Sequence, residues 1–207
     1  MAIMAKDSGG KDFKKVSPGC HFAICNMVVD CGLQEGFSGK PQHKVYLRWE
    51  VPDERVEYDK DGKHHEGPCS IGSLYTLSLS EKANLRKVLE NWRGKPFTLE
   101  ELKGFDIVAI LGKPCQIMVQ HSEDGKYANV TGVMGPSREQ KERARTARAE
   151  NELISYSLEE HSAERFNKLP NWLKEKIESR MEEPTEGQPS SAQSSSQTED
   201  FDDDIPF

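Results

Sequence analysis

The sequence predicts a mainly β fold: a five-stranded Greek-key barrel, followed by a charged helical extension and a disordered acidic tail. Residues 18–136 consist mostly of strand-like runs with one clear helical segment, whereas residues 137–182 are highly charged. From residue 183 onward Pro, Ser, Gln and Glu dominate. An apolar fraction of 35% and a charged fraction of 30% in 207 residues fit one compact core with polar appendages.

Three strand-like runs follow an expected mobile arm, residues 1–17, which is rich in Lys, Gly and Ser. The first run is Cys20–Cys31. The second, Lys44–Val51, alternates cleanly between apolar and polar residues and is expected to stop at Pro52. Its apolar face holds Val45, Leu47, Trp49 and Val51. A polar segment with a turn at Asp61-Gly62 leads to the third run, Cys69–Leu79.

One helix is expected after the third run. Ser80 with Glu81 indicates its capped start, and Gly94 indicates its end. Its periodic apolar positions are Leu85, Val88, Leu89 and Trp92. Thr98 and Glu101 match a capping box, which predicts a short second helical turn.

A hairpin completes the predicted domain. Cys115–His121 and Lys126–Met134 are strand-like and flank a turn at Asp124-Gly125. The resulting order, β-β-β-α-β-β, is that of the OB-fold, a Greek-key barrel that commonly binds oligonucleotides. Other small β barrels also have five strands, but the position of the helix favours the OB-fold.

Residues 137–182 form the predicted helical extension. Arg138–Arg148 carries five basic residues against two acidic ones and has no apolar stripe wide enough for a core. Pro170 is expected in the first turn of a helix over Asn171–Arg180. Its apolar face, which could dock on a partner or on the barrel, holds Trp172, Leu173 and Ile177. Residues 183–199 cannot bury enough apolar surface to fold and are expected to be a disordered linker.

The net charge of −7 is distributed unevenly. Residues 186–207 contain six acidic residues and no Lys or Arg, so they carry −6, and the other 185 residues carry −1. Residues 1–136 hold 18 basic and 18 acidic side chains. An acidic pI of 5.5 ordinarily argues against nucleic-acid binding, but here most of the excess negative charge lies on the tail. A neutral domain can bind a polyanion only where its basic groups gather on one face.

Composition and motifs argue against several other classes. No stretch is long and apolar enough to span a membrane and no apolar segment follows the N-terminus, so we expect a cytoplasmic protein without a membrane partner. The five cysteines contain no C-x-x-C pair and are expected to be reduced, buried thiols. Zinc stays an alternative at Cys20, Cys25 and Cys31, or at His64, His65 and Cys69. No Walker loop, nucleophile elbow or H-E-x-x-H occurs, so neither catalysis nor a cofactor is expected.

Binding of single-stranded nucleic acid requires aromatic platforms for the bases and cations along the backbone. The polar face of the second run supplies both in one row, whose members are Lys44, Tyr46 and Arg48. The alternative is an ordinary solvent-exposed strand face. Tyr75 of the third run is a further candidate that could equally belong to the core. Lys126 and Tyr127 begin the fifth strand beside the hairpin turn, where OB-fold loops meet nucleic acid.

The last eight residues, Asp200–Phe207, combine an acidic run, a rigid apolar tip and a terminal carboxylate. A partner protein could hold Phe207 in an apolar pocket and its carboxylate on Arg or Lys. The residues expected to bind such a partner are Asp202, Asp203, Asp204, Ile205, Pro206 and Phe207. This segment resembles the C-terminal tip of bacterial single-stranded-DNA-binding proteins, which recruits replication and repair enzymes. The alternative is a solvated acidic tail that aids solubility.

Two further stretches, Lys44–Pro52 and Leu79–Phe97, resemble a family of phage replication-module proteins, and Phe166–Ile177 resembles that family's helical extension. Members of the family look like OB-fold single-stranded-DNA-binding proteins. The resemblance implies a phage replication or recombination protein that works in the host cytoplasm, coats single strands without sequence specificity, and recruits replication, recombination or repair enzymes.

Two other functions stay open. The chain could be an adaptor or inhibitor that captures host repair enzymes through the tip with little DNA binding, or a nuclease built on the barrel. Homo-oligomers are also compatible with the sequence.

Overall fold

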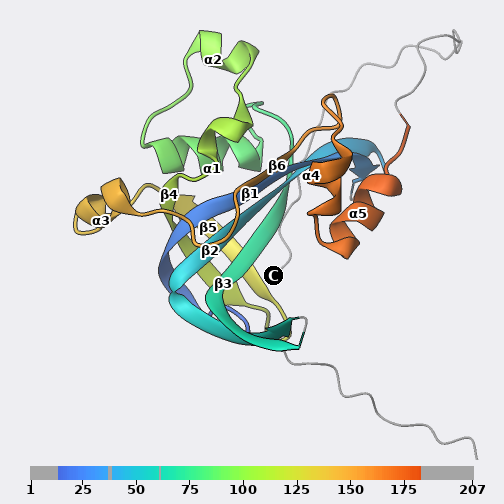
Figure 1. Ribbon diagram of the computed structural model, residues 1–207. Coiled ribbons are helices and arrows are strands. Elements are labelled where there is room, and N and C mark those ends of the chain that lie inside the picture. The colour runs from blue at the N-terminus through green and yellow to red at the C-terminus, as the bar shows by residue number, and fades with distance from the viewer. Residues whose placement is uncertain (1–13, 37–38, 61, 183–207) are drawn as a thin grey trace, which may run out of the picture.

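The computed structural model describes residues 14–36, 39–60 and 62–182 (Figure 1). The strands of this part are β1 (Gly19–Glu35), β2 (Pro41–Lys60), β3 (Lys63–Thr76), β4 (Pro114–His121), β5 (Ala128–Met134) and β6 (Ile154–Tyr156). The helices are α1 (Asn84–Arg93), α2 (Leu99–Lys103), the short 3-10 helix η1 (Ile107–Ile110), α3 (Lys141–Thr146), α4 (Ala163–Asn167) and α5 (Asn171–Glu178).

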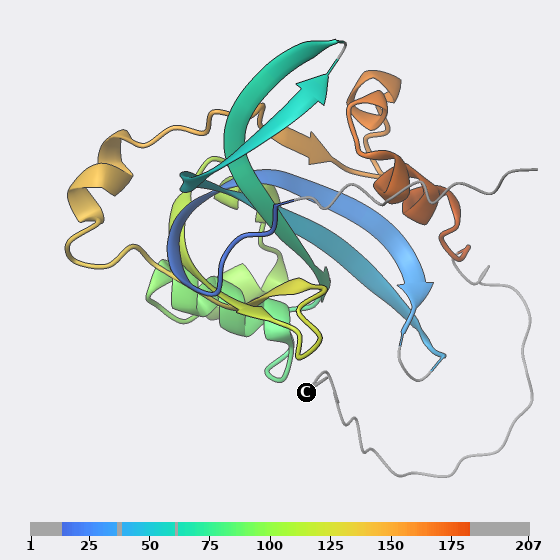
Figure 2. The ribbon, with the colours of Figure 1, turned by 90° about the horizontal axis from the view of Figure 1, so that it is seen from below.

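The strands form one strongly curved sheet with the neighbour order β3-β2-β1-β4-β5 (Figures 1 and 2). These pairs are antiparallel, and β6 pairs in parallel with β1. The predicted mainly β class and the β-β-β-α-β-β order are confirmed. The sheet does not close into a barrel, because β3 and β5, its outermost strands, touch but are not paired in the described structure.

The main core fills the concave side of the sheet. The predicted apolar face of β2 is buried there, and α1 adds Leu85, Leu89 and Trp92. Trp49 of β2 lies at its centre with no exposed surface. Its indole ring meets Tyr75 at a centroid distance of 6.5 Å and Trp92 at 6.3 Å.

Most element ends differ from those predicted. α1 ends at Gly94, as expected, with φ 67°, but it begins at Asn84 with Ala83 as its N-cap rather than Ser80. Ala83 is buried and its N–H closes a turn onto the Ser80 carbonyl, which places Ser80 before the helix. The capping box of Thr98 and Glu101 is confirmed.

The second strand does not stop at Pro52. β2 continues to Lys60 and pairs with residues 63–68, so the expected polar segment is a two-stranded arm. Pro52 lies inside a register irregularity between Val51 and Arg55, where its missing N–H removes no regular ladder bond. The turn at residue 62 is confirmed by the left-handed φ of 71° at Gly62.

The C-terminal extension packs on the convex face of β1 and not on a core of its own. β4 pairs with residues 19–24 of β1, and β6 takes the same edge over residues 27–29. A second apolar cluster forms beneath it from Met27, Val29, Cys31, Tyr156, Leu169, Leu173 and Ile177. The predicted helix at residue 171 is confirmed, and Leu173 and Ile177 dock on the sheet, but Trp172, expected on the same face, stays 46% exposed.

In the described part of the chain, no helix is both long enough and apolar enough to cross a membrane.

Candidate nucleic-acid interface

A groove runs along the gap between β3 and β5, where the sheet stays open. Its volume is about 1390 Å³, and it is bounded by β3, by the first turns of α1 and by the β4–β5 hairpin. Lining residues important to the site are Gly72, Leu74, Tyr75, Thr76, Lys87 and Tyr127. The groove therefore offers hydroxyl, amide, aromatic and cationic groups along one extended path.

The hairpin between β4 and β5 places an exposed aromatic ring at the rim of this groove. Gly125 takes the left-handed conformation with φ 66°, as the Asp124-Gly125 turn predicts. The Ser122 hydroxyl donates to Asp124 Oδ1 at 2.6 Å and accepts the Tyr127 N–H at 3.0 Å. These bonds fix the turn, and the Tyr127 side chain stays 67% exposed.

The charges at the hairpin are mixed. Hydrogen bonds from the Ser122 hydroxyl and the Lys126 N–H hold the pKa of Asp124 below its ordinary value. Lys126 Nζ lies 3.3 Å from Asp124 Oδ2, and Lys15 Nζ donates to the carbonyl of Gly125 at 2.6 Å. Lysine side chains therefore lie on both sides of the turn, but the carboxylate of Asp124 is paired with one of them, Lys126.

Two of the predicted DNA-binding residues line the groove together. Tyr127 stands at the rim, whereas Tyr75 forms part of the wall and is only 9% exposed. Burial raises the pKa of Tyr75 to about 12. Tyr75 therefore belongs largely to the core, the alternative that its sequence position left open, and Tyr127 is the ring accessible to a base.

The row on β2 is divided between two environments. Lys44 reaches the groove, because its Nζ donates to Thr76 Oγ1 at 2.9 Å and Thr76 is a lining residue. Tyr46 lies under the extension, where its ring meets Trp172 edge to face at a centroid distance of 5.0 Å. Burial raises the pKa of the Tyr46 phenol.

Arg48, the last member of the row, is held in a buried polar network. Its Nε donates to Asn26 Oδ1 at 3.0 Å, and burial lowers the pKa of its guanidinium. The direct binding of DNA by Tyr46 and Arg48 stays a prediction. In the structure Tyr46 contacts the extension through Trp172, and Arg48 is hydrogen-bonded to Asn26 of β1.

Glu50 completes that network and was not singled out by sequence reasoning. Its carboxylate has no exposed surface and accepts the backbone N–H groups of Glu150 at 2.7 Å and of Asn151 at 3.0 Å. Asn151 Nδ2 donates to it as well, at 2.8 Å. Glu50 lies on the polar face of β2 and alternates with the apolar residues, so the sequence indicates a solvent-exposed side chain. Only the partner segment, a hundred residues later, makes it buried.

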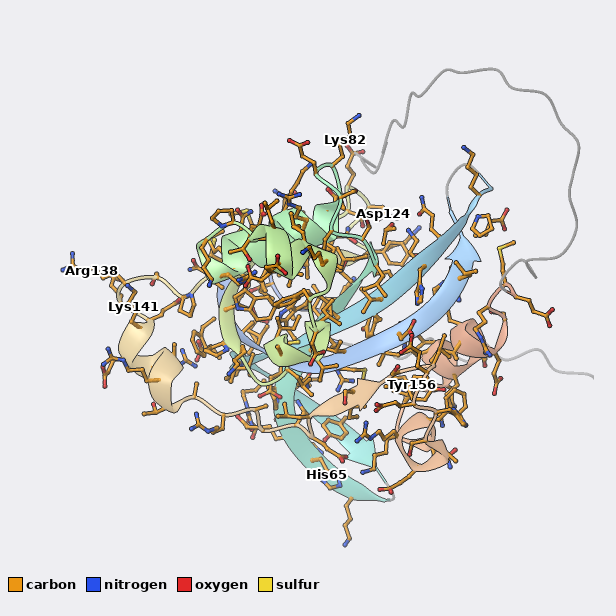
Figure 3. The ribbon with its side chains drawn as sticks, turned by 90° about the horizontal axis from the view of Figure 1, so that it is seen from above. His65, Lys82, Asp124, Arg138, Lys141 and Tyr156 are labelled. Carbon is orange, nitrogen blue, oxygen red and sulfur yellow. The ribbon has the colours of Figure 1, made fainter. Side chains whose placement is uncertain are left out.

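The basic segment of the extension does not line the groove. Arg143 makes two hydrogen bonds of 2.7 Å to Asp53, and its guanidinium lies 4.3 Å from the centre of the Phe22 ring. Figure 3 shows Arg138, in the turn before α3, and Lys141, at the start of α3, well away from Asp124 at the hairpin. This segment anchors α3 to the sheet at a distance from the groove.

Possible metal ligands are dispersed in the described residues, where no three His, Cys, Asp or Glu side chains gather to hold an ion. His64 and His65 are exposed on the β2–β3 arm, and Figure 3 shows His65 near its end, whereas Cys69 is buried. Four thiols are buried as expected, and Cys20 is exposed.

The predicted partner-binding residues, 202–207, lie outside the described residues.

The chain matches no protein-family model, and neither the curated proteins nor the solved structures contain a significant match to it.

Proposed function

We propose that this chain is a single-stranded-DNA-binding protein that coats DNA without sequence specificity and recruits replication, recombination or repair enzymes through its C-terminal tip. The observation that carries the proposal is the open groove between β3 and β5, with the exposed ring of Tyr127 and the amine of Lys87 among its lining residues. A single strand needs a path of this kind, with a stacking surface and cations spaced along it.

An OB-type barrel is the finer fold that we infer. Its strands follow the neighbour order found here, with a helix between the third and fourth strands, and such barrels are partly open. OB-folds bind oligonucleotides with the face of their second and third strands and with the loop between the fourth and fifth. Lys44 and Thr76 lie on the first of these surfaces, and Tyr127 lies on the second.

The groove would bind DNA by stacking and by neutralising phosphate charge. A base can stack on the accessible ring of Tyr127, and every base has such a π-face, so binding is sequence-tolerant. Lys87 lines the groove and can meet phosphates, and Lys44 and Lys126 lie next to the lining residues Thr76 and Asp124. Because contacts between lysine and phosphate release counterions, affinity is expected to fall as salt rises.

The test is fluorescence anisotropy with a labelled oligothymidine at several salt concentrations. Tyr127→Ala should weaken binding by about 1–3 kcal/mol, the usual contribution of a stacked base. Tyr58→Ala is the matched control, because Tyr58 is also an exposed tyrosine, 44% accessible, but lies on the distant arm. Equal affinity for duplex and single strands, or equal losses in the two variants, would contradict the proposal.

A second candidate function is favoured by the acidic side chains at the groove, Glu123 and Asp124, which oppose binding of a polyanion. In that case the chain is an adaptor or inhibitor that captures host enzymes with little DNA affinity. Deleting Phe207 separates enzyme capture from DNA binding. Binding to an enzyme that recognises the C-terminal tip of bacterial single-stranded-DNA-binding proteins should be lost, and oligothymidine binding should persist. An adaptor would show the first effect but no oligothymidine binding at all.

A further inference from the structure

Trp172 is the one exposed tryptophan of the chain. Trp49 and Trp92 are buried in the main core, with 0% and 8% exposure, whereas Trp172 is 46% exposed on α5. Large exposed rings are costly on a protein surface unless they serve an interface, and tryptophan is among the residues that carry most binding energy in interfaces.

The position of Trp172 is fixed from both sides. The next residue, Leu173, and Ile177 one turn later are fully buried in the second cluster, so α5 cannot turn freely. The ring of Tyr46 meets the indole at an angle of 84°, an arrangement in which one ring presents its edge to the face of the other. Little further freedom would therefore be lost when a ligand stacks on the indole.

The Trp172 surface is continuous with the groove. Tyr46, which supports the indole, pairs in register with Leu74, and Leu74 is 39% exposed and lines the groove. The hydroxyl of Tyr46 also lies over Gly72, so closely that a Cβ at position 72 would overlap it. Gly72 is a lining residue as well, so the tyrosine ring bridges the space between α5 and the groove wall.

We propose that Trp172 is a second base-stacking platform, and that single-stranded DNA runs from Tyr127 through the groove and across β3 to α5. This inference rests on the proposed DNA binding and extends it, because it makes the C-terminal extension a part of the DNA surface. Lys44 lies two residues from Tyr46 on the same strand face, and its Nζ donates to Thr76 Oγ1, which belongs to the groove wall. The occupant is a nucleobase, because Tyr46 and Leu74 join the indole surface to the groove that we propose binds single-stranded DNA.

The test combines affinity with intrinsic fluorescence. Trp172→Ala and Trp172→Leu should each lower affinity for a long oligothymidine roughly tenfold, the loss of one stacked base. Leucine keeps the apolar contact with Tyr46 but offers no π-face, so the Trp172→Leu variant distinguishes the loss of stacking from a loss of folding. Tyr58→Ala again serves as the control. Oligothymidine should quench the emission of the parent protein, and Trp172→Leu should abolish that change, because the other two tryptophans are buried.

Oligonucleotide length gives a further criterion. A very short oligothymidine can occupy only one platform, so a loss at Trp172 should grow with length, whereas the loss in Tyr127→Ala should be present throughout the series. If the parent binds DNA but both Trp172 variants bind as tightly, with quenching unchanged, this inference is wrong and the proposed function stands. If the parent binds no single strand, both fail.

Discussion

Glu50 shows how one residue joins two distant parts of the chain. A carboxyl group removed from solvent needs hydrogen bonds that replace its hydration, and here the backbone N–H groups of residues 150 and 151 provide them. Asn26, which also has no exposed surface, links it to Arg48. The network determines where the extension begins to follow the sheet.

Replacing Glu50 with Gln should lower the free energy of unfolding by about 2 kcal/mol, because one side-chain oxygen becomes an amide that cannot accept the N–H groups facing it. Urea denaturation followed by circular dichroism measures the change. Glu57→Gln, on the exposed β2–β3 arm, is the matched control and should alter stability little. A similar midpoint for Glu50→Gln and the parent would show that the network does not stabilise the fold.

A second prediction concerns the reactivity of the cysteine thiols. Burial raises the pKa of Cys25 and of Cys31 to about 12, and it raises that of Cys115 and Cys69 too. A raised pKa keeps these thiols protonated at pH 8, and the thiolate is the reactive form. A disulfide reagent should therefore titrate one thiol, Cys20, in the native protein and all five in denaturant. Cys20→Ser should remove the fast-reacting thiol, and rapid reaction of several native thiols would contradict the described packing.

At the scale of elements, the two cores meet on opposite faces of β1. α5 covers the convex face through Leu173, which is fully buried, together with Ile177. α3, at the other side of the molecule from α5 (Figure 1), is instead attached by the ion pair of Arg143 with Asp53. The extension is thus held by apolar contacts at one end and by charge at the other.

Leu173→Ala should lower the free energy of unfolding by about 2–4 kcal/mol, the usual cost of a cavity left by a buried leucine. It should also increase the reactivity of Cys31, which lies in the same cluster. Leu99→Ala provides the control, because Leu99 is 80% exposed on α2. Denaturation curves of both variants measure the change in stability, and thiol titration measures the reactivity of Cys31. Unchanged stability in Leu173→Ala would mean that α5 contributes nothing to the fold.

Local sequence patterns predicted the element types better than their ends. The alternation at residues 44–51 and the glycines at 94 and 125 act through neighbours in the chain, so they could be recognised. Pro52 was expected to end a strand, but a register irregularity accommodates it, and that depends on the opposite strand. For the same reason the polar row on β2 did not reveal that Tyr46 is covered, because Trp172, which contacts it, comes more than a hundred residues later.

For the whole molecule, the distribution of charge matters more than its total. The body from residue 1 to 185 carries −1 and the last 22 residues carry −6. A tethered anion can compete with DNA for the same lysines, and salt weakens both interactions.

Removing residues 186–207 should therefore raise affinity for oligothymidine at low salt, and the gain should shrink as salt is added. Anisotropy titrations of the parent and the truncated chain provide the comparison. A variant that replaces the six acidic residues with Asn or Gln at full length controls for chain length. Weaker binding after truncation would place DNA contacts in the tail itself.

The position of β1 between two cores has a consequence for mutational tolerance. Most strands of a curved sheet have one face that accepts polar replacements, but from Phe22 to Val29 every side chain of β1 is buried. Alternation along this strand therefore separates two kinds of damage: a change at Val28 disturbs the main core, and a change at Val29 releases the extension. In a saturation-mutagenesis experiment these eight positions form one uninterrupted intolerant block, unlike the alternating pattern of an ordinary strand.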